Sequence, residues 1–445
     1  MYFTNPGSLI PRLKGDLPHS PLLPTLAQTF ACQRWPHAYL ERCRARYGDS
    51  FTAYPAGMPP LVFLSDPNDI RTVITASPSV LHPGAGAKVI SPLVGDRSFM
   101  LQEEEQHMRG RSAVMPAFRR KRLEEHTDLI RGIVSREVSS WPEGIAFAAH
   151  PHLRALTLRV ILTSVFDRED TVIDELHRRL LIVLSATASL VLRESWLRHL
   201  PGWHATWSEF LKQRHLSDEL IFSLIRRRHQ EESDRGDLLD MLRKFTNPDG
   251  STVTDQQARD HVMSVILAGH ETTASELAWG MQLLAHNRPV QERLIEEIAR
   301  DEDAPYLRAT VQEVLRDRPV FLFTIPRVVM APIEIREYDY RPPVQLLGCI
   351  YLLHHDPALY DEPQEFRPER FLQTPPQPLT WLPWGGGRKR CPGQHLANLE
   401  METVLRATLA NQTIEPASDH MEHARWRSVI VTPHEGSRII LRRRQ

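Results

Sequence analysis

One cysteine of this 445-residue chain stands in a setting that suits chemistry. Residues 382–393 read LPWGGGRKRCPG, so three consecutive glycines precede Cys391 and Pro392 follows it. A glycine run lets the backbone pass close to a flat or bulky group, such as a cofactor face. The apolar residues after Pro392 predict a helix that begins directly after Cys391 and whose N–H groups would stabilise a thiolate. Composition and spacing favour this reactive thiolate no more than a free cysteine in a tight turn.

A second set of polar residues interrupts a long apolar pattern. Residues 268–273 read AGHETT and follow the apolar run VMSVIL. Glycine is unfavourable within a helix, and an acid followed by two threonines favours hydrogen bonds back to the helix's own carbonyls, with bending. A zinc-protease motif is excluded because its second histidine would have to stand where the chain has Ala274. The segment is therefore either a buried polar patch or a bend that opens a groove over a cofactor.

Three sets of charged residues have spacings or neighbours of interest. Glu313 and Arg316 are three apart on a helical pattern, so their side chains share a face. His107 and Arg111 are four apart on another helical pattern, and Arg327 follows an apolar stretch. Taken singly, each set is typical of solvated surface charges or surface ion pairs.

In their order along the chain, these motifs resemble those of the cytochrome P450 family. The cysteine loop of that family, Phe-x-x-Gly-x-Arg/His-x-Cys-x-Gly, is matched by Gly387, Cys391 and Gly393. Two positions depart from it. Trp384 stands where phenylalanine is usual, and Lys389 stands where arginine or histidine usually contacts a haem propionate.

The resemblance covers nearly the whole chain and implies a haem b cofactor (iron protoporphyrin IX) with Cys391 as the thiolate ligand of the iron. It places Glu271 and Thr272 as the acid and alcohol that deliver protons to bound O2. Positive groups would bind the two buried propionates. The cofactor-binding residues that the resemblance implies are His107, Arg111, Ala268, Gly269, Arg327, Trp384, Lys389, Cys391 and Gly393.

The family's meander motif is matched by residues 365–371, EFRPERF. In the family its arginine, here Arg370, joins the glutamate and arginine at positions 313 and 316 of this chain. A buried triad of Glu313, Arg316 and Arg370 is costly unless every group is hydrogen-bonded, so we expect it to fix geometry rather than to add stability.

The resemblance also implies the reaction: insertion of one atom of O2 into a hydrophobic small molecule, in secondary metabolism. The substrate is expected to meet the loop 84–101, the segment 173–192 and the apolar residues Val265, Val320, Phe321, Leu322 and Phe323. Oxidative coupling or desaturation by the same haem is an alternative. A peroxide-driven hydroxylase and a non-catalytic haem-binding sensor are others, but neither needs the Glu271–Thr272 pair.

Helical periodicity sets the expected architecture. Patterns of this kind cover residues 153–166, 173–192, 207–231 and 254–287. Short β-type pieces occur at 328–335 and 438–441, so the fold class is mainly α with a small β part. The family likeness adds a cytochrome P450 fold, with a long central helix over the haem and a C-terminal cysteine-ligand loop. Residues 1–445 are expected to form one such domain, with no fused reductase or ferredoxin.

Composition limits the partners. Lys plus Arg number 54 and Asp plus Glu 55, so a net charge of -1 gives no field that would attract nucleic acid. The four cysteines lack metal-finger spacing, and neither a signal peptide nor an apolar run of about 20 residues occurs, so a cytoplasmic protein without a membrane anchor is expected. Electrons would come from a ferredoxin or flavodoxin with its NAD(P)H-dependent reductase. The basic residues 388–390 would suit an acidic partner.

Overall fold

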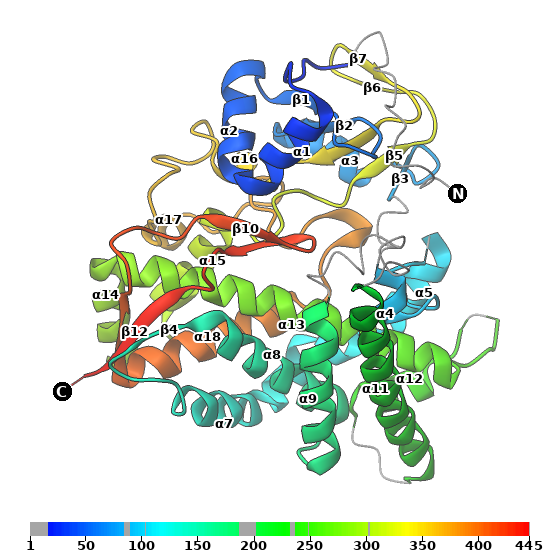
Figure 1. Ribbon diagram of the computed structural model, residues 1–445, viewed down its shortest axis with the longest axis vertical. Coiled ribbons are helices and arrows are strands. Elements are labelled where there is room, and N and C mark those ends of the chain that lie inside the picture. Colours follow the sequence, from blue (N-terminus) through cyan, green and yellow to red (C-terminus); the bar gives the residue numbers. More distant parts are fainter. Residues whose placement is uncertain are drawn as a thin grey trace. The chain divides into compact units, whose positions relative to one another are not determined.

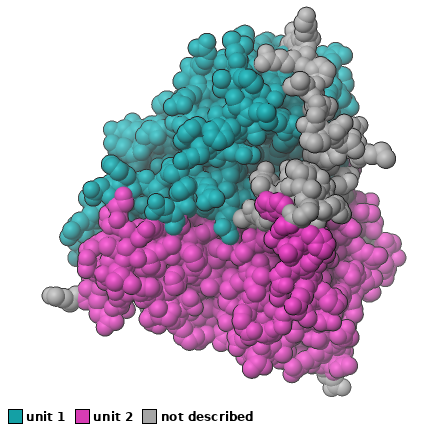
Figure 2. All heavy atoms as spheres, in the orientation of Figure 1, with its two compact units in different colours: residues 1–84, 282–391, 419–435 teal, residues 85–281, 392–418, 436–445 magenta. Residues whose placement is uncertain are grey.

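A computed structural model of the chain describes residues 17–83, 90–102, 104–186, 202–231, 236–247, 249–300 and 303–444. Helices dominate, and four small sheets accompany them (Figure 1). Within these residues, no helix has both the length and the hydrophobicity that crossing a bilayer would take. The chain divides into two compact units, which are coloured separately in Figure 2.

Unit 1 comprises Met1–Gly84, Gln282–Cys391 and Asp419–Glu435. Its helices are α1 (Thr25–Arg34), α2 (Pro36–Tyr47), α3 (Pro67–Thr75), α14 (Arg288–Arg300), α15 (Pro305–Asp317), α16 (Ile350–His354) and α17 (Glu369–Gln373), with the 3-10 turn η5 (Gly387–Lys389). Its strands are β1 (Ser50–Ala53), β2 (Leu61–Leu64), β3 (Leu81–His82), β5 (Arg327–Val329), β6 (Ile333–Ile335), β7 (Tyr338–Tyr340), β8 (Gln345–Gly348), β10 (Ala424–Arg427) and β11 (Ile430–Pro433).

The largest sheet of unit 1 has the strand order β1-β2-β8-β5-β3. Strands β2 and β8 run parallel, and the other neighbours run antiparallel. Helix α3 packs against this sheet, because Ile70, Val73 and Ile74 enter the same buried cluster as Val62 and Leu346. Asp66 caps α3 by accepting a hydrogen bond of 2.8 Å from the Asn68 N–H.

Unit 2 comprises Ala85–Met281, Pro392–Ser418 and Gly436–Gln445. Its helices are α4 (Ser91–Val94), α5 (Glu104–Val114), η2 (Met115–Phe118), α6 (Arg120–Glu125), α7 (Thr127–Val138), α8 (Ala149–Phe166), α9 (Thr171–Ser185), α11 (His204–Gln230), α12 (Leu238–Lys244), most of α13 (Asp255–His286) and α18 (Gln394–Asn411). Its strands β4 (Ala146–Ala148), β9 (Gln412–Pro416) and β12 (Arg438–Arg443) form one antiparallel sheet.

Helix α13 begins with a capping box between Thr254 and Gln257. The Thr254 N–H donates to Gln257 Oε1 at 2.9 Å, and the Gln257 N–H donates to Thr254 Oγ1 at 3.3 Å. The expected central helices are confirmed as α8, α9, α11 and α13. Helix α9 ends at Ser185, and the remainder of its expected range, from residue 187, lies outside the described residues.

Two expected boundaries were wrong. The β-type piece 328–335 is divided between β5 in the five-stranded sheet and β6 in a separate hairpin with β7. Between them, Pro332 has no N–H with which to continue a ladder. The helix after the cysteine begins at Gln394 rather than at Pro392, with Gly393 as its N-cap.

Candidate functional site

Cys391 ends a loop that backbone hydrogen bonds close. Its N–H donates to the Trp384 carbonyl at 2.9 Å, and the Arg390 N–H donates to the Gly387 carbonyl at 3.2 Å. At the start of the loop, the Leu382 N–H donates to Nε2 of the buried His354 at 2.8 Å. Cys391 forms no disulfide and is half-buried, and Trp384 and Lys389 are half-buried too. The loop thus presents one thiol that is not consumed by a disulfide.

The glycine run has two different structural causes. Gly385 and Gly387 both have a φ of +63°, in the left-handed region that favours glycine. A Cβ on Gly385 would meet nothing within 4 Å, whereas one on Gly387 would overlap the Ile74 carbonyl oxygen. The sequence led us to expect a close approach to a cofactor face. At Gly386 and Gly387 the close neighbour is Ile74 of α3.

Arg327, on β5, is a buried cation. Its side chain lies inside unit 1, and burial lowers the pKa of the guanidinium. Among the residues that the structure describes, no carboxylate forms an ion pair or hydrogen bond with it. A buried charge without a counter-charge is costly. This position therefore fits an anionic group supplied by a ligand, and a haem propionate is such a group.

Helix α5 carries His107 and Arg111 on one face. His107 is buried, and its Nδ1 lies 2.7 Å from the Phe99 carbonyl oxygen. Because a carbonyl can only accept, the proton on Nδ1 is committed to this bond. His107 can therefore donate to a carboxylate through Nε2 only as a doubly protonated imidazolium. Arg111 is half-buried one turn further along.

The centre of α13 changes from buried to accessible at the AGHETT segment. Val265 and Ile266 are buried, whereas Ala268 is exposed and Thr272 is half-buried. Thr272 Oγ1 donates to the Ala268 carbonyl at 2.6 Å, which is the back-bonding that the sequence favours. A Cβ on Gly269 would lie 3.1 Å from Cδ1 of Ile161, so this glycine permits close packing of α8 on α13.

Glu271 is held by α8. Its Oε2 accepts a charge-assisted hydrogen bond of 2.7 Å from Arg154 Nε, and its Oε1 lies 3.5 Å from His150 Nε2. The side chains of all three residues are largely buried. Arg154 and His150 were not identified in the sequence. The available signal was that these two basic residues stand four apart on a helical pattern rich in apolar residues, where a charge needs a partner.

A second buried acid, also missed, approaches α13 from α18. Glu400 is buried and hydrogen-bonds with the side chain of Thr273, the residue after Thr272. Burial raises the pKa of Glu400 well above its usual range, so the carboxyl is neutral where an exposed glutamate would be ionised. Two buried acids, Glu271 paired with Arg154 and Glu400 with its raised pKa, therefore belong to the surroundings of the threonines of α13.

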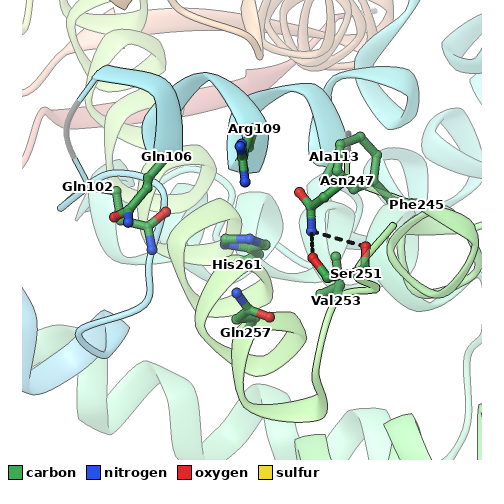
Figure 3. Close-up of a pocket in the computed structure, with 11 residues that line it drawn as sticks. Gln102, Gln106, Arg109, Ala113, Phe245, Asn247, Ser251, Val253, Gln257 and His261 are labelled. Atoms are coloured by element: carbon green, nitrogen blue, oxygen red, sulfur yellow. Dashed lines mark hydrogen bonds between the residues drawn. The ribbon is translucent and has the colours of Figure 1, made fainter. Parts of the chain in front are cut away.

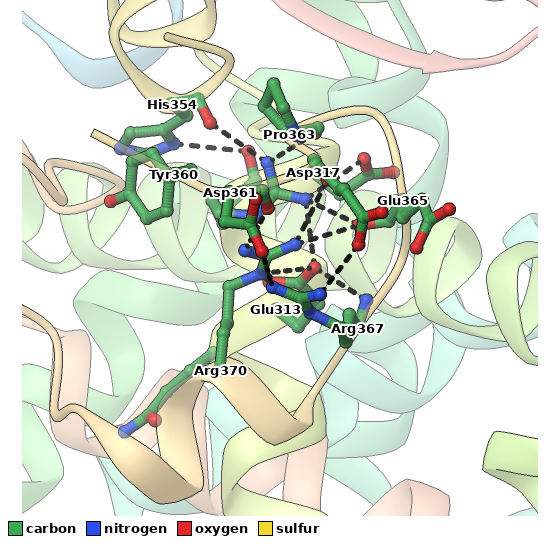
Figure 4. Close-up of polar contacts among 12 residues, drawn as sticks. Glu313, Asp317, His354, Tyr360, Asp361, Pro363, Glu365, Arg367 and Arg370 are labelled. Carbon is green, nitrogen blue, oxygen red and sulfur yellow. Dashed lines mark hydrogen bonds and ion pairs between the residues drawn. The ribbon is translucent and has the colours of Figure 1, made fainter. Parts of the chain in front are cut away.

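The Glu313–Arg316–Arg370 set forms one network in unit 1 (Figure 4). Arg316 is fully buried and donates to both carboxylate oxygens of Glu313, at 2.8 and 2.9 Å. It also donates to the carbonyls of His354, Pro363 and Glu365 at 2.9, 2.8 and 3.1 Å. Arg370 Nε donates to Glu313 at 3.1 Å. The network thus attaches α15 to the irregular chain that precedes α17.

The expected substrate residues have different surroundings. Leu322 and Val320 are buried within unit 1, and the Phe323 ring packs between Phe63 and Trp426, with centroids 5.8 and 5.7 Å away. Phe321 is exposed. In unit 2, part of the expected loop 84–101 is attached to α13 by the buried Arg259, which donates to the carbonyls of Leu93 and Val94 at 3.2 and 3.1 Å. Residues 84–89 lie outside the described part of the chain.

A small pocket of unit 2 lies beside α5 (Figure 3). Its volume is about 180 Å³, and it is lined by Gln102, Gln106, Arg109, Asn247, Gln257 and His261 among others. His261 is buried, and burial lowers its pKa to about 4, so the ring is neutral at physiological pH. Because this pocket is small and is lined in part by amide, guanidinium and imidazole side chains, it does not match the hydrophobic substrate pocket that the sequence predicts.

Comparison with known proteins decides the family. The profile of the family described as Cytochrome P450 matches residues 18–440. The chain belongs to the cytochrome P450 family. One relative, the putative cytochrome P450 135B1 of Mycobacterium tuberculosis, is 32% identical over 438 residues, which cover 96% of this chain and 91% of the relative. The putative cytochrome P450 138 of the same organism is 32% identical over 408 residues, 91% of each chain.

Solved cytochrome P450 structures have the same fold. Retinoic acid-bound cyanobacterial CYP120A1 superposes with a TM-score of 0.82 at 21% identity, covering 96% of this chain and 100% of that one. The haem domain of cytochrome P450DA superposes with a TM-score of 0.81 at 21% identity, covering 96% of this chain and 98% of that one. The expected mainly α cytochrome P450 fold is confirmed. As a family member, the chain is a monooxygenase that works with haem, O2, a substrate and a redox partner.

The two glycines of equal φ give a direct test of the cysteine loop. We expect Gly385→Ala to lower the free energy of unfolding by about 1 kcal/mol, the cost of a left-handed alanine. Gly387→Ala should cost about 3 kcal/mol, because its Cβ also meets the backbone of Ile74. Urea unfolding followed by circular dichroism measures both. Equal losses would mean that the approach to Ile74 does not constrain the loop.

The raised pKa of Glu400 predicts a pH dependence of stability. Between the unfolded pKa and the raised folded pKa, the folded protein keeps a proton that the unfolded chain has lost, so stability falls as pH rises through this window. Glu400→Gln keeps a hydrogen-bonding group for Thr273 and removes the titration. The melting temperature of the variant should therefore decline less between pH 5 and 8 than that of the parent, and identical slopes would contradict a neutral Glu400.

Proposed function

We propose that this cytochrome P450 inserts one atom of O2 into a hydrophobic small molecule of secondary metabolism, at a haem b whose iron is bound by Cys391. The observation that carries this proposal is the half-buried Cys391 thiol, which forms no disulfide and whose backbone N–H is bound to the Trp384 carbonyl. The buried Arg327, with no carboxylate partner among the described residues, supports it, because a propionate would supply the missing charge.

The haem would be held by the cofactor-binding residues that the sequence suggests. Arg327, Arg111 and an imidazolium form of His107 would bind the propionates, and Lys389 stands where the family has another propionate contact. Trp384 and Gly393 would lie beside the thiolate, and the exposed Ala268 with the half-buried Gly269 would form the part of α13 that meets the haem. When bound, the haem activates O2, helped by the electron density of the thiolate.

The chain's own residues handle the protons. Because Thr272 donates its hydroxyl proton to the Ala268 carbonyl, the lone pairs of Oγ1 can accept a hydrogen bond from a group beside Ala268. Arg154 fixes the carboxylate of Glu271 one residue away. We assign Glu271 and Thr272 to proton delivery, with Arg154 and His150 as positioning residues.

We infer a hydrophobic substrate because Val265 and residues 320–323 are apolar, and the Phe321 side chain among them is exposed.

Electrons would be delivered one at a time by a ferredoxin or flavodoxin with its NAD(P)H-dependent reductase. This transfer would take place in the cytoplasm, and residues 1–445 would act as one cytochrome P450 domain. Arg388 and Arg390 are exposed beside the cysteine and suit an acidic partner. The Glu313–Arg316–Arg370 triad would position the chain that leads to the cysteine loop.

Reduction with dithionite in the presence of carbon monoxide tests the ligand. A thiolate-bound haem gives a strongly red-shifted carbon monoxide band, and we expect Cys391→Ser to abolish it, because a hydroxyl does not replace the thiolate. Cys349→Ser is the matched control, since that thiol is buried and donates to the Leu322 carbonyl. Retention of the band in Cys391→Ser would place the ligand elsewhere.

The hydroxyl of Thr272 should govern how efficiently electrons are used. In Thr272→Ala we expect haem content to be unchanged, while product per NAD(P)H falls about tenfold and hydrogen peroxide rises. Thr272→Ser, which restores the hydroxyl, should recover most of the coupling. Steady-state turnover with surrogate redox partners and a substrate that the enzyme oxidises gives the product and the hydrogen peroxide formed per NAD(P)H consumed. Unchanged coupling in the alanine variant would remove Thr272 from proton delivery, and a protein without substrate-stimulated turnover would fit a sensor.

A further inference from the structure

The small pocket of unit 2 has no part in the monooxygenase chemistry proposed above. It lies between α5, the start of α13 and the chain that joins α12 to α13 (Figure 3). Its lining includes the amides of Gln102 and Gln106 and the apolar side chains of Ala113, Phe245 and Val253. Its volume of about 180 Å³ equals that of about six water molecules in the liquid, and pockets for drug-sized ligands begin at roughly 300 Å³. The space therefore suits one small ring.

His261 of α13 brings to this pocket a polar ring that the protein does not satisfy. The side chain is 4% exposed, and its Nδ1 has no hydrogen-bond partner among the described residues. A Cβ on Gly110, which also lines the pocket, would lie 3.3 Å from Nε2, so α5 places no side chain against that edge of the ring. A neutral imidazole has one donor and one acceptor. A ligand that pairs with this ring would relieve the cost of a buried polar atom without a partner.

Two amides of the pocket each have one end committed to the protein. Gln257 Oε1 accepts from the N–H and the hydroxyl of Thr254, at 2.9 and 3.0 Å, so its Nε2 has two N–H groups left to donate. Asn247 Nδ2 donates to the carbonyl and the hydroxyl of Ser251, at 3.2 and 3.0 Å (Figure 3), so its Oδ1 is left to accept. The pocket thus offers defined donors and acceptors within one small space.

The charges around the pocket favour a neutral ligand. Arg109 already donates to Glu105 at 2.7 Å and to Asp249 at 3.0 Å, so two carboxylates balance its charge and would repel a bound anion. None of the described residues that line the pocket is acidic, so a cation would lack a counter-charge there. An uncharged polar molecule remains as the suitable class of ligand.

We propose that this pocket binds a neutral planar ring with cyclic amide or imide groups, of the pyrimidine-base type. The N–H groups and carbonyls of such a ring alternate along its edge, and they would pair with Gln257 Nε2, Asn247 Oδ1 and the His261 ring. The face of the ring would pack against Phe245. The proposal goes beyond the monooxygenase function and does not depend on it.

Free uracil is the probe, because it is a neutral six-membered ring with both N–H groups and carbonyls. We expect saturation-transfer NMR with the full chain to give a dissociation constant on the order of 1 mM, which suits a ligand of about eight non-hydrogen atoms. The analogue 1,3-dimethyluracil keeps the ring and its carbonyls but has no N–H, so it should bind about tenfold more weakly. Inorganic phosphate should not displace uracil.

Two variants test the assigned residues. His261→Phe keeps a flat ring and removes its nitrogens, so the dissociation constant for uracil should rise about tenfold. Gln106→Met changes an exposed residue of the lining, which the fold tolerates, and should weaken uracil binding several-fold. The matched control Gln373→Met changes an exposed glutamine of α17 in unit 1 and should bind uracil like the parent. An unchanged circular dichroism spectrum verifies the fold of each variant.

Several outcomes would overturn the proposal. No binding of uracil to the parent, or equal binding of 1,3-dimethyluracil, would mean that the pocket does not select such a ring. Displacement of uracil by phosphate would make this an anion site. A shift of the haem absorption band on addition of uracil would place the ring at the haem, and unchanged affinity in both the His261 and the Gln106 variants would place it elsewhere on the protein.

Discussion

The buried guanidinium of Arg316 is the constraint on which the C-terminal part of unit 1 depends. A cation with no solvent contact must have its donors satisfied by the protein. Glu313 provides two acceptors, and the carbonyls of His354, Pro363 and Glu365 provide the others. The chain between α16 and α17 has almost no regular structure, so these bonds, rather than a helix or a sheet, define its path. The cysteine loop follows this segment.

A related constraint applies to α13. Near its centre, Glu271 and Thr273 are buried beside the half-buried Thr272, and each buried polar group needs a partner there. Helix α8 supplies Arg154 for Glu271, and α18 supplies Glu400 for Thr273. Ionisable groups brought together in a buried place are typical of functional sites. One acid that is ion-paired therefore precedes the two threonines in α13, and a second acid with a raised pKa contacts Thr273 from α18.

Sequence reasoning succeeded where the relevant spacing is local. The Glu313–Arg316 pair is three residues apart on one helix, so periodicity alone places these side chains together. Motif order then identified the family. The contacts that were missed join distant parts of the chain. Arg154 and Glu271 are 117 residues apart, and nothing in the local pattern of either segment specifies the other as its partner.

The approach of Gly387 to Ile74 is another contact of this kind, and it limits how the loop can be reused. Ile74 belongs both to α3 and to the buried cluster under the five-stranded sheet, so the loop that bears Cys391 is shaped by a helix more than 300 positions earlier in the chain. A cysteine loop transplanted into another scaffold would lack this neighbour, and its glycines would be free to rearrange. Grafting the thiolate site therefore requires α3 and its sheet as well. The smallest transferable part of the protein is a set of segments that lie far apart in the sequence, and the cysteine motif alone is not enough.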